Sequence, residues 1–142
     1  MTITFNYKQV DRPEPYPSQC VPAIPVTLIG AKVNIAVVGL LDSGADYCAI
    51  PKGMADILGL DLSSKPEPIG GIGGDAKAIK TKMRIMVWKG REKYTFTVGV
   101  YVVVGQMQDD FPLLIGRDGF FDKFKITFIE KQRKIKLKRD LS

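Results

Sequence analysis

Leu40-Leu41-Asp42-Ser43-Gly44-Ala45-Asp46 is the stretch on which the interpretation of this chain depends. It places a carboxylate where an apolar, strand-like run over residues 33–41 ends in a turn. That is an expensive position for an ionised group unless it is hydrogen-bonded or used. The triplet Asp42-Ser43-Gly44 is weak on its own, because an Asx-turn with a positive φ at Gly44 would explain it as well.

Two further motifs accompany this stretch. Ile69-Gly70-Gly71-Ile72-Gly73-Gly74 follows it, and Leu113-Leu114-Ile115-Gly116-Arg117-Asp118 lies near the C-terminus. The glycine run could be a flexible linker, but an Ile among four glycines, followed by a strand-like segment, favours a mobile hairpin. In order and spacing the three motifs resemble those of the retropepsins, the single-domain aspartic proteases of retroviruses, retrotransposons and their cellular relatives. The resemblance covers roughly residues 21–130.

The resemblance implies a role for residues in each motif. Asp42 would be the catalytic residue, Ser43 would brace the catalytic loops through its hydroxyl, and Gly44 would allow the sharp turn. Arg117 would support the site by pairing with Asp46. Ala49 is a further apolar subsite wall by resemblance. The substrate-binding residues implied are Ala45, Asp46, Gly71, Ile72, Gly73 and Leu114.

The chemistry of this family needs two carboxyl groups. Hydrolysing an amide without a metal or a covalent intermediate takes a base for water and an acid for the carbonyl oxygen, and two adjacent carboxyls sharing one proton supply both. The chain holds one Asp-Ser-Gly and no second copy. The resemblance therefore implies a two-fold homodimer acting as an endopeptidase on a peptide or protein substrate, without cofactor or metal.

Composition excludes other chemistries. The chain has 142 residues and no histidine, so a Ser-His-Asp or Cys-His nucleophile and a His-ligated zinc site cannot be built. Its two cysteines, Cys20 and Cys48, are too few for a secreted disulfide scaffold. No apolar run is long enough for a signal peptide core or a membrane span. We expect a cytoplasmic protein with no membrane partner.

The pattern along the chain predicts many short strands and little helix. The strands argue for a mainly-β barrel or sandwich, and the resemblance narrows this to an all-β, closed acid-protease barrel with a glycine-rich flap hairpin. Five prolines between Pro13 and Pro25 predict an extended segment that cannot join a central sheet. Short helices are expected over 51–58, ended by Gly59, and over 118–124, with Asp118 near the N-terminus. Strands are expected at 2–8, 26–29, 33–41, 47–50, 78–88, 93–104, 113–115, 126–129 and 134–137.

We divide the chain into an N-terminal arm and Pro-rich extension, residues 1–20, and a protease domain, residues 21–142. The helix after Pro51 and the hairpin over 126–137 depart from the retroviral pattern and favour cellular or prokaryotic relatives. The basic stretch Lys131–Arg139 is interpreted as the solvated face of a half-buried strand, with contact to nucleic acid as the alternative. The alternative to an enzyme is a catalytically silent peptide-binding or dimerisation module, against which the intact Asp42-Ser43-Gly44 argues.

Overall fold

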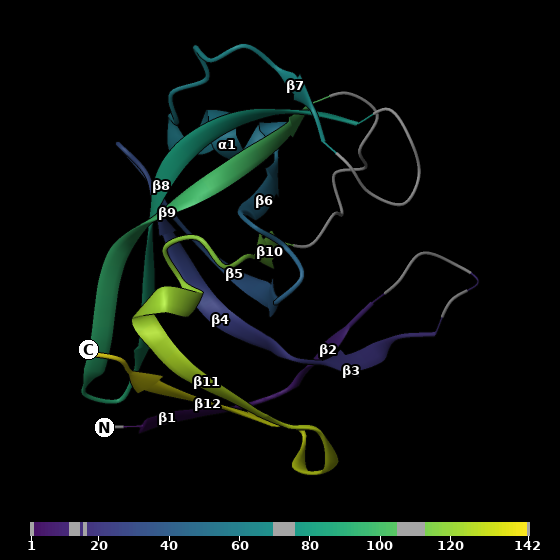
Figure 1. The fold of residues 1–142 in the computed structure, drawn as a ribbon, viewed down its shortest axis with the longest axis vertical. Helices are drawn as coiled ribbons and strands as arrows, with labels where there is room; N and C mark the ends of the chain where they lie inside the picture. The colour runs from purple at the N-terminus through teal and green to yellow at the C-terminus, as the bar shows by residue number, and fades with distance from the viewer. Residues whose placement is uncertain (1, 12–14, 16, 70–75, 105–112, 142) are drawn as a thin grey trace.

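The computed structural model forms a closed β-barrel with a second, smaller sheet beside it (Figure 1). It describes residues 2–11, 15, 17–69, 76–104 and 113–141. The barrel runs in the order β4-β5-β10-β6-β9-β8 and closes by pairing of β4 with β8, while β7 (Glu67–Pro68) extends the edge of β8. The predicted all-β closed barrel is therefore confirmed. Its strands are β4 (Ala23–Ile29), β5 (Asn34–Leu41), β6 (Cys48–Pro51), β8 (Lys77–Lys89), β9 (Glu92–Val104) and β10 (Leu113–Ile115).

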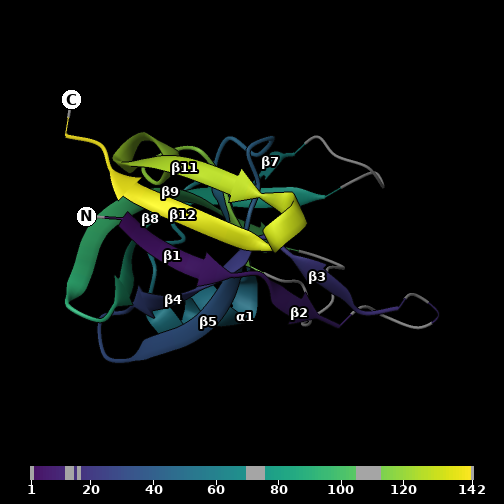
Figure 2. The ribbon, with the colours of Figure 1, turned by 90° about the horizontal axis from the view of Figure 1, so that it is seen from below.

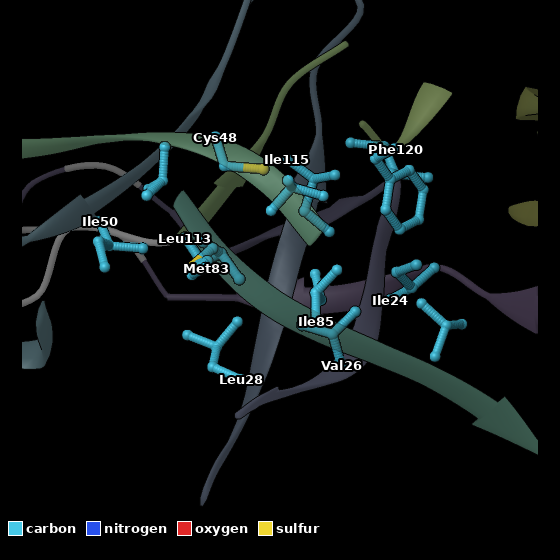
Figure 3. Packing of buried hydrophobic residues seen from close by; sticks show 14 of the residues in the cluster. Ile24, Val26, Leu28, Cys48, Ile50, Met83, Ile85, Leu113, Ile115 and Phe120 are labelled. Atoms are coloured by element: carbon cyan, nitrogen blue, oxygen red, sulfur yellow. The ribbon is translucent and has the colours of Figure 1, made fainter. Parts of the chain in front are cut away.

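The barrel is filled by apolar side chains that alternate along its strands. On β4, Ile24, Val26 and Leu28 are buried, whereas Pro25 between the first two is exposed. Figure 3 shows these three side chains meeting others from β6, β8 and β10 in one cluster. Burying each such aliphatic side chain contributes about 1.5–3 kcal/mol. The core therefore fixes the strand ends from which the first and third sequence motifs continue.

The second sheet joins the two ends of the chain. It has the order β1-β12-β11, with β1 (Thr2–Asn6), β11 (Phe124–Ile129) and β12 (Lys134–Arg139), and Figure 2 shows the three strands side by side. Ile135 and Leu137 of β12 are buried against β1, whereas the lysines between them are exposed. This confirms the interpretation of the basic stretch as one face of a half-buried strand.

An isolated two-stranded ribbon follows β1. β2 (Lys8–Val10) pairs with β3 (Gln19–Val21), and the ribbon projects from the body of the molecule (Figure 1). β1 itself lies in the second sheet, where its Ile3 and Phe5, and Tyr7 just after it, are buried. The division of the chain at residue 20 stays a prediction.

The helices are short. α1 (Lys52–Leu58) ends at Gly59, whose φ of 70° is left-handed, as predicted. The helix expected over 118–124 is reduced to a 3₁₀ turn, η1 (Phe121–Lys123), because Gly119 has a φ of 80° and interrupts the helical path. A second 3₁₀ turn, η2 (Glu130–Gln132), joins β11 to β12. Within the described ranges, no helix has the length and apolar character needed to cross a membrane.

Pro25 corrects one expectation. We expected the proline-rich segment up to Pro25 to stay out of the main sheet, but Pro25 lies within β4, opposite Val38 of β5. The pairing of β4 with β8 covers only Thr27 to Ile29. Pro25 is tolerated because, among the described residues, no strand pairs with β4 at this position on the edge away from β5. No ladder hydrogen bond is therefore lost there.

Candidate active site

Asp42 lies directly after β5, at the start of a turn braced by backbone hydrogen bonds. Its N–H donates to the carbonyl oxygen of Ile115 at 3.0 Å, and its carbonyl oxygen accepts from the N–H of Ala45 at 3.2 Å. Its side-chain Oδ1 accepts from the N–H of Gly44 at 2.9 Å. The Asx-turn considered from the sequence is thus present, but Gly44 does not take the positive φ expected for it. The turn holds a half-buried carboxylate in one orientation. Ser43, next in the turn, is exposed in the single chain.

The far side of the turn is tied to the segment after β10. The N–H of Arg117 donates to the carbonyl oxygen of Ala45 at 2.9 Å, and the N–H of Asp118 donates to that of Asp46 at 2.8 Å. These bonds join the first and third sequence motifs. The geometry of the turn therefore depends on β10 and the residues that follow it.

Arg117 and Asp46 are also joined through their side chains. Nη2 of Arg117 donates to Oδ1 of Asp46, which brings together the two residues expected to pair. The side chains are 56% and 71% exposed, so the ion pair contributes about 0–1 kcal/mol to folding. The pair orients two side chains next to the turn more than it stabilises the fold.

Two glycines allow this close packing. A Cβ on Gly116 would lie 2.3 Å from the carbonyl oxygen of Tyr47, and one on Gly99 would lie 2.6 Å from the Tyr47 ring.

Asp118 corrects a second expectation: its Oδ2 accepts from the N–H of Gly99 at 3.1 Å instead of capping a helix. The reason is that the chain around Asp118 forms turns packed against β9, so the strand supplies the donor.

Leu114 and Ala49 lie on the outer face of the barrel. Leu114 is half-buried and stands opposite Leu40 of β5 and Ala49 of β6, while its neighbours Leu113 and Ile115 point into the core (Figure 3). Directly opposed residues share a face of a sheet. The structure therefore brings both predicted subsite walls onto one surface. Leu40, two residues before Asp42, lies on the same surface.

The glycine-rich motif Gly70–Gly74, with the predicted binding residues Gly71, Ile72 and Gly73, lies outside the described residues. The chain on either side is paired. The N–H of Ile69 donates to the carbonyl oxygen of Ala76 at 3.0 Å, and Pro68 stands opposite Lys77. β7 and the start of β8 therefore form an antiparallel base from which the motif continues.

Cys48 lies just behind the turn and is not a nucleophile. It is fully buried, and burial raises the pKa of its thiol to about 11. Thiolate, not thiol, is the reactive form, so Cys48 is inert near neutral pH and serves in packing. Cys20 is half-buried on β3, and both cysteines are free.

Sequence reasoning missed three residues near this surface, Tyr47, Lys80 and Tyr101, whose side chains form one cluster. Strand alternation puts Lys80 and Tyr101 on an outer face. Only the register between β8 and β9 places them opposite each other.

Comparison with known proteins gives a family and a fold. Residues 19–128 match the family model described as retroviral aspartyl protease. No curated protein sequence matches significantly. A crystal structure of a retropepsin-like aspartic protease from Rickettsia conorii aligns with a TM-score of 0.57 at 18% identity, covering 96% of this chain and 91% of that one. The retroviral protease-like domain of Ddi1 from Leishmania major aligns with a TM-score of 0.53 at 18% identity, covering 86% and 90%. At such identities the structural similarity shows a shared fold.

Proposed function

The chain belongs to the retroviral aspartyl protease family, and from this premise we propose that it is an aspartic endopeptidase whose active site is shared by two identical chains. The observation that carries the proposal is the position of Asp42. It stands directly after the buried Leu41 at the end of β5, within the matched region, in a turn held by Ile115, Gly44 and Ala45. The proposed reaction needs a second carboxyl beside Asp42, and the sequence holds a single Asp-Ser-Gly, so the second must come from another copy of the chain.

The reaction uses the two Asp42 carboxyls and one proton. The ionised carboxylate takes a proton from water as the oxygen attacks the peptide carbonyl carbon, and the protonated partner gives its proton to the carbonyl oxygen. The tetrahedral intermediate collapses when its C–N bond breaks. The leaving nitrogen takes the proton held by the carboxyl that deprotonated water, and one hydroxyl of the intermediate returns its proton to the other carboxylate. Water is the only co-reactant, which suits a chain without histidine.

The neighbouring residues hold the loops and the substrate. The Ser43 hydroxyl braces the two catalytic turns across the two-fold axis, and Ala45 and Asp46 contact the substrate main chain. Gly71, Ile72 and Gly73 cover the substrate, and Leu114 lines an apolar subsite. Arg117 positions Asp46 through their ion pair. This arrangement predicts cleavage between apolar residues of an extended peptide.

A peptide library tests the proposal. We expect the purified protein to cleave peptides with apolar residues at their centre between acid and neutral pH. A statine-type inhibitor, whose hydroxyl imitates the tetrahedral intermediate, should block cleavage because transition-state analogues bind far more tightly than substrates. If a folded dimer cleaves nothing over this range, the protein is a binding module and the proposal fails. Cleavage that the inhibitor does not reduce would also refute the proposal, because it would show another mechanism.

A further inference from the structure

A cation lies over two aromatic rings on the outer face of the barrel. Nζ of Lys80 is 4.6 Å from the ring centroid of Tyr47 and 5.6 Å from that of Tyr101. The two rings meet edge to face, with centroids 4.9 Å apart and an interplanar angle of 75°. The rings therefore hold an exposed lysine side chain in place, since ring faces attract cations.

The cluster lies on the same surface as the predicted subsite walls. Lys80 stands opposite Tyr101, and Tyr101 stands opposite Ala49. Opposed residues share a face, so one continuous row crosses five strands. Tyr47 follows Asp46 directly, and Lys80 lies in β8, two residues beyond Ala78, where the pairing with β7 ends. The row consists of Leu40, Leu114, Ala49, Tyr101 and Lys80.

The cluster carries positive charge available to a ligand. The hydroxyl of Tyr47 beside Lys80 raises the pKa of the ammonium group, so Lys80 is charged near neutral pH. The ion pairs recorded among the described residues involve Lys52, Arg117 and Arg133 as cations. An ammonium has three N–H donors, so Lys80 can donate to a carboxylate as well as to Tyr47.

We propose that Lys80, Tyr47 and Tyr101 form an outer subsite that selects an acidic side chain, Glu or Asp, of the bound peptide. The ammonium donates to the carboxylate, and the ring edges contact the aliphatic part of the side chain. This inference rests on the proposed function, because it takes the row as the substrate surface.

Strand geometry gives the position of the selected residue. Three strand spacings separate Leu114 from Lys80, or about 14 Å at roughly 4.8 Å each. An extended peptide rises about 3.3 Å per residue, so it spans this distance in about four residues. The acidic residue should therefore stand about four positions from the apolar residue that contacts Leu114.

Matched peptides test the inference. The probes are peptides with an apolar centre that differ only in Glu, Gln or Lys at that outer position. We expect kcat/KM for the Glu peptide to exceed that for the Gln peptide by about tenfold, with the Lys peptide poorest, and the difference to shrink at high salt. Lys80→Met should remove the preference, and Lys80→Glu should reverse it toward Lys. The control is Lys136→Glu, which makes the same charge change on the exposed face of β12 and should leave the preference unchanged.

A binding measurement separates the two possible failures. Fluorescence anisotropy with the Asp42→Asn protein measures how tightly the Glu, Gln and Lys peptides bind when none of them is cleaved. If the wild type cleaves all three peptides equally, or Lys80→Glu keeps the preference for Glu, the subsite is refuted and the protease assignment stands. If no peptide is cleaved but the Glu peptide still binds best in a Lys80-dependent way, the protease assignment fails and the subsite stands. Equal binding of the three peptides without cleavage overturns both.

Discussion

Replacing Asp42 by Asn is expected to abolish peptide cleavage and to leave the fold intact. An amide oxygen can still accept the hydrogen bond from the Gly44 N–H, so the turn should keep its shape. The amide cannot take a proton from water, and general acid–base catalysis is worth about 10²–10⁴-fold. We therefore expect kcat to fall by about a thousandfold or more, measured on a peptide that the wild type cleaves, with an unchanged melting temperature.

Asp56→Asn is the matched control for this variant. It makes the same chemical change at an exposed carboxylate on α1, where Asp56 accepts from Lys52 at 3.0 Å. Loss of a surface pair at this spacing costs about 0.3–0.5 kcal/mol, and cleavage should continue at the wild-type rate. Cleavage by Asp42→Asn at the wild-type rate would refute the assignment of the catalytic residue.

Gly116→Ala is expected to destabilise the fold and to reduce cleavage together. The new Cβ would lie 2.3 Å from the carbonyl oxygen and 2.4 Å from the carbonyl carbon of Tyr47. Both contacts are to backbone, so no side-chain rotation relieves them, and the turn or β10 must move. Overpacking of this kind costs about 1–3 kcal/mol or more. The shift also disturbs the bonds that Arg117 and Asp118 make to the turn, so kcat/KM should fall.

Gly53→Ala controls for the change of glycine to alanine itself. Gly53 lies in α1, and a Cβ there meets nothing within 4 Å. Because alanine favours helix over glycine by about 0.5–1 kcal/mol, this variant should be slightly more stable than the wild type. Denaturant unfolding measures both variants. If Gly116→Ala is as stable and as active as the wild type, the close packing of Gly116 against Tyr47 does not hold the turn.

Local patterns predicted much of the fold. The strands predicted at 78–88 and 93–104 correspond to β8 and β9, and Gly59 marked the end of α1 where the structure has it. The pairings of β1 with β12 and of β4 with β8 join segments far apart in the sequence, and no local pattern specifies them. Pro25 was misjudged for the same reason, since its tolerance depends on where the pairing with β8 stops.

The candidate site, like the fold, was predicted from the sequence only in part. The first and third motifs placed Asp42, Gly44 and Arg117 in the chain, and the structure brings these two segments together through backbone hydrogen bonds. Asp118 was wrongly expected to cap a helix. Its actual partner, the N–H of Gly99, belongs to a distant strand and could not be found from local sequence. The cluster around Lys80 depends on register across β6, β8 and β9, which alternation alone does not give.

The central claim is that each chain supplies half of one active site, and a mixing titration tests it most directly. Wild-type protein at fixed concentration is allowed to exchange subunits with increasing amounts of Asp42→Asn, and cleavage of one peptide is followed. Because a mixed dimer holds one catalytic carboxyl, activity per wild-type chain should fall to roughly half at equal amounts and approach zero in excess. Activity per wild-type chain that stays constant at every ratio would contradict the claim.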